Sequence, residues 1–377
     1  QESAWTTIRY PNAIYDDEQH RWISDAEVAE VPYTAFTSHP KAEHVTARPR
    51  FPFPRYPRGW FCIGYGQDLA VGQVEPVVCF GRDLVMYRGE DEVVRVLDAH
   101  CPHLGAHLGV GGKVEGCRIR CPFHAWVFDG TDGKCVEVPY AKRIPAKAAV
   151  KTWHVCEVNG MIMLWHGIDG APPAWEIPEI PEWREREAWT PYSFRQWRIR
   201  SHNQEMGENA VDQAHFRYVH GMSVMPIPHT IELEYPKLRM VTATKMQTPR
   251  GEVDGELEAT NWGHGFSTSR FTGLIPITLV ASTTPVDDEY VDLRFAFMVS
   301  LKMGPQAAAG VGNAFSAEIA RQLEQDKPIW ETKIYLERPV ICDGDGPIAR
   351  YRKWCEGFYP EWYARQAREA YERAQAG

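Results

Sequence analysis

The chain has 377 residues, of which 44% are hydrophobic and 24% are charged, a composition that excludes an intrinsically disordered chain, a collagen-like repeat and a coiled coil. A chain of this length predicts about two domains. Its 50 acidic and 41 basic residues give a net charge of −9, which repels a phosphate backbone, so no nucleic-acid partner is expected.

The nine cysteines and fourteen histidines could form disulfides or bind metal. An odd cysteine count in a chain of this size, with no secretory signal pattern at its start, favours a reducing compartment, and we expect a cytoplasmic protein. The longest apolar runs, Met161 to Trp165 and Leu274 to Ser282, fall short of the roughly 18 residues that span a bilayer. We therefore predict no integral membrane segment. In a reducing compartment, the clustered Cys and His are expected to bind metal or to take part in catalysis.

Residues 1–55 are predicted to form an N-terminal arm. The arm leads into a proline-rich stretch, Pro49 to Pro57, which can continue neither a helix nor a central strand. Residues 56–168 then predict a small all-β domain, because short β-rich runs are separated there by turn residues. The hairpin signals Asp132-Gly133 and Asn159-Gly160 mark two of these turns. The predicted strands are Val74 to Phe80, Leu84 to Arg88, Val93 to Leu97, Trp126 to Asp129, Lys134 to Val138 and Met161 to His166.

Residues 169–183 are rich in proline and predict a stiff linker between domains. Residues 184–377 predict a mixed α+β domain, an antiparallel sheet with flanking helices. Val291 to Leu301 is typical of a strand, whereas Phe315 to Trp330 and Glu361 to Ala376 have the spacing of helices. We expect Pro328 to limit the first of these helices.

Within the predicted all-β domain, Cys101 and His103 form a C-x-H pair, and Cys121 and His124 form a C-x-x-H pair. Thiolate and imidazole ligands suit either zinc or an iron–sulfur cluster. A structural zinc site commonly takes ligands of one kind from each loop, whereas here each loop mixes the two kinds. Two Cys on one iron and two His on the other is the ligation of a Rieske 2Fe-2S cluster, which we predict at these four residues.

A second group of metal-binding residue types follows the linker. Asp212 and His215 have the spacing of one helix face, which would let the carboxylate orient the imidazole. His220 would point elsewhere on an unbroken helix, but Gly221 allows the helix to end there. Two histidines and one carboxylate bind iron in non-haem oxygenases. His215 and His220 alone also fit two ordinary helix histidines. The prediction of an iron site therefore depends on Asp212 before them and on the Cys and His pattern upstream.

The third ligand must come from elsewhere in the chain. Asp326 is the candidate that we favour, at the end of the helix that Pro328 is expected to limit. Glu324 and Glu331 are its local rivals, and we expect both to be exposed helix charges.

The segment from Asp98 to Pro145 resembles the Rieske domain of Rieske non-haem iron oxygenases, especially their steroid and sterol branch. That branch contains 3-ketosteroid 9α-hydroxylases and Neverland-type cholesterol 7-desaturases. The run from Asn209 to His220 is similar to the iron motif of these enzymes, and Gln325 to Trp330 resembles their third-ligand segment. The resemblance covers about residues 55 to 365. Ala125 departs from it, because family members usually carry Gly or Asp there, and we expect this to alter packing rather than ligation.

The resemblance implies an oxygenase that hydroxylates or desaturates a steroid or sterol nucleus. It implies one 2Fe-2S cluster and one mononuclear Fe(II) per subunit, with iron ligands His215, His220 and Asp326. O2 would be the co-substrate, and electrons would come from NAD(P)H through a flavin and iron–sulfur reductase or a ferredoxin. It also implies a homotrimer in which Asp212 links His215 to a cluster histidine of a neighbouring subunit, with Asn209 hydrogen-bonded near the iron.

The substrate is expected to be an apolar small molecule. Seven apolar residues of the second domain could line its pocket, although core packing is the plainer role for most of them: Trp262, Phe266, Phe271, Leu274, Ile275, Phe295 and Phe297. Two other functions stay open at this point. One is a Rieske monooxygenase or demethylase of a non-steroid substrate, and the other is a Rieske electron-transfer protein without an oxygenation site.

Overall fold

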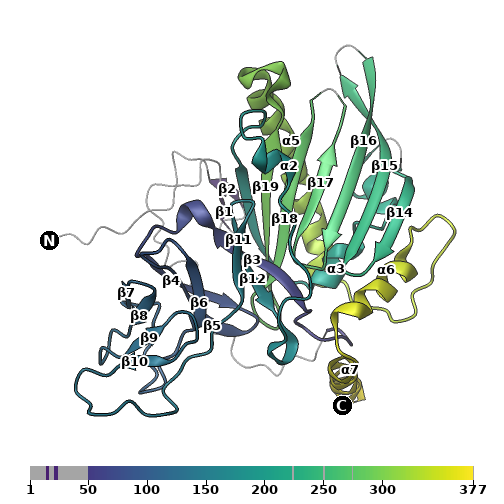
Figure 1. Ribbon diagram of the computed structural model, residues 1–377. Helices are drawn as coiled ribbons and strands as arrows, with labels where there is room; N and C mark the ends of the chain where they lie inside the picture. Colours follow the sequence, from purple (N-terminus) through teal and green to yellow (C-terminus); the bar gives the residue numbers. More distant parts are fainter. Residues whose placement is uncertain are drawn as a thin grey trace.

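The structure is a computed structural model that describes residues 14–16, 21–23, 50–222, 225–248, 251–273 and 275–376 (Figure 1). Most of the predicted arm lies outside these ranges. Two short strands within it, β1 (Ile14–Asp16) and β2 (Arg21–Ile23), pair antiparallel.

Residues 59–166 fold into strands, as the sequence predicts, and we call this part the β domain. It holds a four-stranded sheet in the order β10-β9-β8-β7 and two three-stranded sheets, β4-β5-β6 and β11-β12-β3. The strands are β3 (Gly59–Tyr65), β4 (Val74–Cys79), β5 (Arg82–Arg88), β6 (Val94–Asp98), β7 (Lys113–Glu115), β8 (Arg118–Arg120), β9 (Val127–Asp129), β10 (Cys135–Glu137), β11 (Val155–Val158) and β12 (Met161–His166).

Both predicted hairpin turns of the β domain are confirmed. Asn159 and Gly160 have φ angles of 54° and 72° between the paired strands β11 and β12, as a type I′ turn requires. Gly133, with φ 75°, lies between β9 and β10, which also pair antiparallel. The sequence did not predict β3, because this strand is buried on both faces and therefore shows no alternation of polar and apolar residues.

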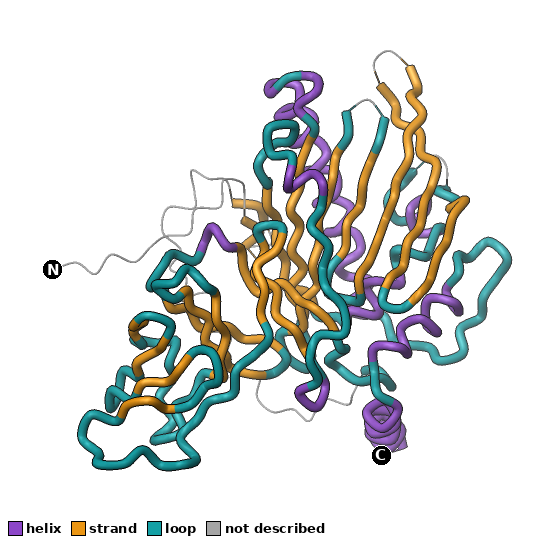
Figure 2. Tube along the Cα trace, in the orientation of Figure 1, coloured by secondary structure: helices purple, strands orange, loops and turns teal. Residues whose placement is uncertain are grey.

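The second half of the described chain forms one antiparallel sheet of seven strands in the order β13-β19-β18-β17-β16-β15-β14 (Figure 2). The predicted mixed α+β class is confirmed. The strands are β13 (Ser193–Ile199), β14 (Pro228–Glu234), β15 (Lys237–Thr248), β16 (Gly251–Trp262), β17 (Ser267–Phe271), β18 (Ile277–Pro285) and β19 (Val291–Val299). The helices are α2 (Pro181–Arg184), α3 (Asn203–Glu208), α4 (Ala214–Tyr218), α5 (Pro305–Thr332), α6 (Ile348–Cys355) and α7 (Glu361–Ala376), with short 3-10 turns at Gly66–Asp68, Ile168–Gly170, Leu301–Met303 and Glu356–Phe358.

One face of this sheet packs against the β domain. Val280, Ala296 and Met298 share a buried cluster with Trp60 and Met161 of the β domain. Ile177 and Ile180 of the predicted linker belong to the same cluster, so this segment is packed against both parts rather than surrounded by solvent. The domain boundaries at 55, 168 and 183 stay predictions.

On the opposite face of the sheet, α5 packs over β13 and β19. Leu323 and Trp330 of α5 pack against Trp197 of β13 and Leu293 of β19. Because side chains alternate along β19, its odd-numbered residues face α5 and its even-numbered ones face the β domain. The sheet therefore lies between the β domain and α5.

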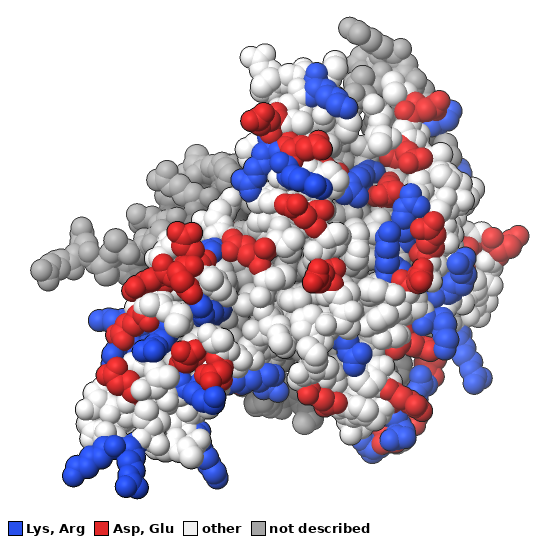
Figure 3. Space-filling view, in the orientation of Figure 1, with Lys and Arg blue, Asp and Glu red and all other residues white. Residues whose placement is uncertain are grey.

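The prediction that Pro328 limits α5 is wrong. The helix continues through Pro328 to Thr332. A proline in the last turn removes a single intrahelical hydrogen bond, and the hydroxyl of Thr332 donates to the carbonyl of Pro328 at 2.6 Å. Within the ranges that the structure describes, none of the helices could span a bilayer. Basic and acidic side chains are interspersed over the large sheet in Figure 3, and basic ones gather at the lower tip of the β domain.

Candidate functional site

Two loops of the β domain fold in the same way and carry the four predicted cluster ligands. In the first loop, the N–H of Cys101 donates to Ala106 and the N–H of Gly105 donates back to Cys101, both at 2.9 Å. In the second, the N–H of Cys121 donates to Trp126 at 2.8 Å and that of Ala125 donates back to Cys121 at 3.2 Å. Each loop thus turns tightly around its cysteine.

The side chains of these loops converge. Cys101 and Cys121 are 2% and 3% exposed, their side chains are hydrogen-bonded to each other, and both are free thiols. The rings of His103 and His124 lie 4.6 Å apart between centroids and nearly perpendicular, at 75°. Nδ1 of His103 is buried and has no hydrogen-bond partner among the described residues. Two thiols, two imidazoles and an unsatisfied ring nitrogen fit a metal cluster with mixed ligands.

Burial raises the pKa of the Cys101 thiol to about 11, and the neighbouring Cys121 raises it further. A thiol of this pKa stays protonated at neutral pH unless a cation lies beside it. Metal binding here should therefore release protons, as thiolate ligation does in general.

We expect Ala125→Gly to raise the free energy of unfolding by about 1 kcal/mol, measured by denaturant titration of the metal-loaded protein. Ala125 has a φ of 57°, in the left-handed region that glycine adopts without strain. Gly105 is its counterpart in the first loop, with φ 77°, and a Cβ added there would meet nothing within 4 Å. Gly105→Ala is the matched reverse change and should cost a similar amount. A loss of stability in Ala125→Gly would contradict this account.

The second half of the chain brings His215, His220 and Asp326 together. One ligand atom from each lies within 4.8 Å of the other two. Nε2 of His220 is 3.4 Å from Oδ2 of Asp326, and the two imidazole centroids are 5.1 Å apart. His215 lies on α4, His220 follows the end of that helix, and Asp326 lies on α5. We call these residues the iron trio, after their predicted role.

Gly221 shapes the turn that carries His220. It has a φ of 76°, and its N–H donates to the carbonyl of Arg217 at 3.1 Å. A residue in the left-handed conformation ends a helix in this way. The predicted helix end is confirmed, and the turn lets His220 lie beside His215 rather than farther around the helix.

Hydrogen bonds leave the same ring nitrogen of each histidine free for metal. Nδ1 of His215 donates to the backbone carbonyl of Asp212 at 2.8 Å, and Nδ1 of His220 donates to Oε1 of Gln325 at 3.1 Å. Nε2 is then unprotonated in both rings. Burial lowers the pKa of His215, which favours the neutral form that binds metal. The sequence analysis missed the role of Gln325, although this residue immediately precedes Asp326.

Asp326 is buried, and burial raises its pKa to about 6, although His220 and a hydrogen bond from Asn209 act in the opposite direction. Asn209 also accepts a hydrogen bond from Nε1 of Trp330 at 3.3 Å. The rivals of Asp326 are partly buried, not exposed as expected, and they have other contacts. Glu324 accepts from Nε1 of Trp197 at 2.9 Å, and Glu331 accepts from the N–H of Arg200 at 3.2 Å.

The predicted arrangement of Asp212 is wrong in one respect. Asp212 precedes α4, so it does not share a helix face with His215. Its backbone carbonyl, not its carboxylate, binds the imidazole, and its Oδ1 accepts from the N–H of Ala214 at 3.0 Å. Asp is favoured at helix starts because its side chain can satisfy these amides. Oδ2 lies 3.7 Å from Nδ1 of His215, and the side chain is 36% exposed.

The residues predicted to line a pocket separate onto the two faces of the sheet. Phe266 and Trp262 belong to the cluster shared with the β domain. Phe271 and Phe297 contact Phe315 of α5, with ring centroids 4.7 and 6.2 Å apart. Ile275 and Phe295 also lie on the α5 side, whereas Leu274 lies outside the described residues.

Two family models match the chain. The Rieske [2Fe-2S] domain matches residues 59–154, and the 3-ketosteroid 9alpha-hydroxylase C-terminal domain matches residues 164–359. A probable 3-ketosteroid-9-alpha-monooxygenase oxygenase component from Rhodococcus rhodochrous is 35% identical over 82% of this chain and 81% of its own length. A cholesterol 7-desaturase from Xenopus laevis is 30% identical over 81% of this chain and 72% of its own.

Solved structures are similar in fold. NdmA of Pseudomonas putida CBB5 with caffeine has a TM-score of 0.65 at 20% identity, over 84% of this chain and 94% of that one. Dicamba monooxygenase bound to dicamba has a TM-score of 0.64 at 19% identity, over 80% of this chain and 96% of that one.

Proposed function

The chain belongs to the 3-ketosteroid 9α-hydroxylase family of Rieske oxygenases, and we propose that it hydroxylates or desaturates a steroid or sterol. O2 is the co-substrate, and electrons come from NAD(P)H through a reductase or a ferredoxin. The observation that carries this proposal is the presence of two candidate metal sites in one chain, the paired Cys and His loops and the iron trio. An electron carrier would need the first alone.

Residues of both sites fit the cofactors of this enzyme class. Cys101, His103, Cys121 and His124 would hold one 2Fe-2S cluster per subunit, and the iron trio would hold one mononuclear Fe(II). When bound, the cluster supplies single electrons and the iron supplies O2 activation. The protein's own part is to leave Nε2 of both histidines available and to place the carboxylate of Asp326 beside them.

The sheet face that carries α5 leaves room for a flat substrate. Strand register places small side chains next to one another there, in two rows across β16, β17 and β18. All are partly exposed although they lie in the middle of the sheet. They lie between α5, which packs on β13 and β19, and α6, which packs on β14 and β15. We call them the floor: Ala259, Asn261, Ser267, Ser269 and Ala281.

Product analysis tests the function. The enzyme would be reconstituted with a reductase and NADH and given a panel of sterols, 3-ketosteroids and methoxy-aromatics. We expect a hydroxylated or desaturated product from a member of the first two groups. Conversion of methoxy-aromatics alone would support the demethylase alternative, and two irons per chain instead of three would support the electron carrier.

We expect Ser269→Phe to lower product formation by at least about tenfold, because a phenyl ring on the floor takes the space of the substrate. Iron content and the visible absorption of the cluster should stay unchanged. Ser269→Ala is the matched control, since it removes the hydroxyl and keeps the space. Wild-type turnover in Ser269→Phe would show that the substrate lies elsewhere.

We also propose that the enzyme is a homotrimer. Within one chain, the β domain and α5 pack on opposite faces of the sheet (Figure 1), which supports a position of the two proposed metal sites on opposite sides of it. Apolar side chains are exposed around the cluster loops, among them Leu104 at 65% and Phe123 at 62%. The partly exposed Asp212, beside His215, would join that histidine to a cluster histidine of the neighbouring copy.

A further inference from the structure

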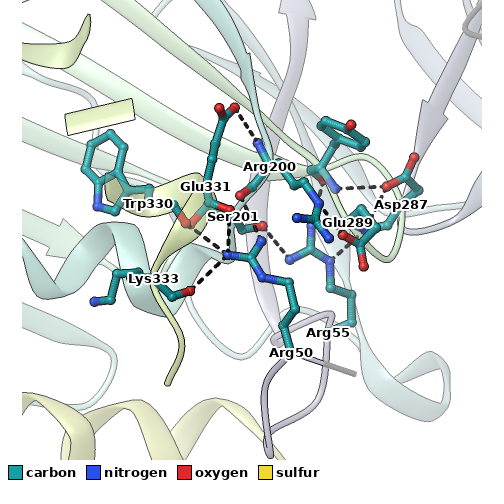
Figure 4. Close-up of polar contacts among 10 residues, drawn as sticks. Arg50, Arg55, Arg200, Ser201, Asp287, Glu289, Trp330, Glu331 and Lys333 are labelled. Carbon is teal, nitrogen blue, oxygen red and sulfur yellow. Dashed lines mark hydrogen bonds and ion pairs between the residues drawn. The ribbon is translucent and has the colours of Figure 1, made fainter. Parts of the chain in front are cut away.

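Arg50 forms an unusual set of hydrogen bonds at the end of α5. Its Nη1 donates to the carbonyl of Arg200 at 3.0 Å (Figure 4). Its Nη2 donates to the carbonyl of Trp330 at 3.0 Å and to those of Glu331 and Lys333 at 3.2 Å each. One guanidinium therefore binds two chain segments that are far apart in the sequence.

Two of the carbonyls that Arg50 binds, those of Trp330 and Glu331, are among those that a helix leaves unsatisfied. The last four carbonyls of a helix have no partner within it, and a positive charge at this end is favourable. Trp330 and Glu331 lie in the last turn of α5, and Lys333 follows its last residue. Arg50 thus caps α5 from outside the catalytic half of the chain.

Both segments bound by Arg50 lead to the iron trio. Asp326 lies one turn before Trp330 on the same helix. The Trp330 indole donates to Asn209, which in turn is hydrogen-bonded to Asp326. Arg200 immediately precedes the segment that runs through α3 to Asn209 and on to His215.

Neighbouring contacts hold the same junction. The N–H of Arg200 donates to Oε1 of Glu331 at 3.2 Å, and Nζ of Lys333 lies 2.9 Å from Oε2 of the buried Glu205. Nε2 of His202, which caps α3, donates to the carbonyl of Pro54 at 3.0 Å. These contacts show that residues 50–54 pack where the start of α3 meets the end of α5.

We propose that Arg50 is a positioning residue of the iron centre, which fixes α5 relative to the segment of α3 and α4 and so sets Asp326 against the two histidines. This inference rests on the proposed function. The hydrogen bonds of Arg50 go to backbone carbonyls and not to the side chains of the iron trio. It acts through the backbone of the two segments that carry the ligands.

Co(II) titration tests the inference. The mononuclear site would be emptied with a chelator that spares the cluster, and Co(II) binding would be followed by its visible absorption bands. Arg50→Ala should bind Co(II) about tenfold more weakly than the wild type, a typical loss when a group that orients a ligand is removed. Arg50→Lys should recover part of this affinity, because it keeps the charge but not the planar fork that reaches both segments.

Tyr56→Phe is the control. Its hydroxyl donates to Oδ1 of Asp288 at 2.8 Å, so it ties the same segment to the β18–β19 turn instead of to α5. It should bind Co(II) as the wild type does. The cluster absorption reports that each variant is folded.

Wild-type Co(II) affinity in folded Arg50→Ala would overturn the inference. If Arg50→Ala does not fold, wild-type affinity in Arg50→Lys would overturn it equally. A wild-type chain that binds no Co(II) outside the cluster would instead refute the proposed function.

Discussion

Asp326→Ala should contain two irons per chain where the wild type contains three, and its turnover should fall by at least about 100-fold. Asp326 supplies the carboxylate of the trio and is buried at 8% exposure, 3.4 Å from Nε2 of His220. Two neutral imidazoles alone bind Fe(II) weakly, because a carboxylate contributes both a ligand and a negative charge. Metal analysis and turnover measure the effect, and the visible absorption of the cluster should not change.

Glu324→Gln is the matched control on the same helix. The amide keeps an oxygen that can accept from Nε1 of Trp197, as Glu324 does at 2.9 Å, while the charge is lost. This variant should keep three irons and its turnover. Three irons in Asp326→Ala would mean that another carboxylate completes the site.

Asp212→Asn should keep all three irons and yet lose turnover by about 100-fold. The amide oxygen can still accept from the N–H of Ala214, so α4 keeps its first hydrogen bond. What disappears is the charged acceptor that is proposed to join His215 to a cluster histidine of the neighbouring copy. A loss of turnover with full metal content would therefore locate the defect between the two sites.

The rate at which substrate and O2 reoxidise the reduced cluster measures this defect directly. That rate should fall in Asp212→Asn while iron content stays constant. Glu337→Gln offers a control, because Glu337 is an exposed carboxylate paired with Arg368. Near-normal turnover in Asp212→Asn would remove Asp212 from the proposed mechanism.

The cluster loops could be predicted from sequence because each contains its Cys and His within four residues and needs no long-range contact to be recognised. His215 and His220 could be predicted for the same reason, because they lie five residues apart in the sequence. The position of Asp326 beside His220 depends on the packing of α5, more than 100 residues later, so the sequence could suggest the residue but not the contact.

Two of the errors have a common physical cause. In both, side chains bind backbone amides or carbonyls near the end of a helix and so change where the helix begins or ends. Asp212 was assigned to a helix face from its spacing to His215. Its carboxylate instead binds the first amides of α4, so the residue precedes that helix. Pro328 was expected to limit α5, but the hydroxyl of Thr332 and the guanidinium of Arg50 bind the carbonyls around it. Such partners lie up to 283 residues away and cannot be inferred from local propensity.

The sheet between the β domain and α5 has a consequence for newly made chains. In the proposed arrangement, a chain that has acquired both metals but has not met its copies holds its cluster and its mononuclear iron on opposite sides of seven packed strands. Such a chain is poorly placed to pass electrons to O2 in the absence of substrate. The sheet would thus limit oxidative damage to the chain until the proposed trimer brings the sites of different chains together.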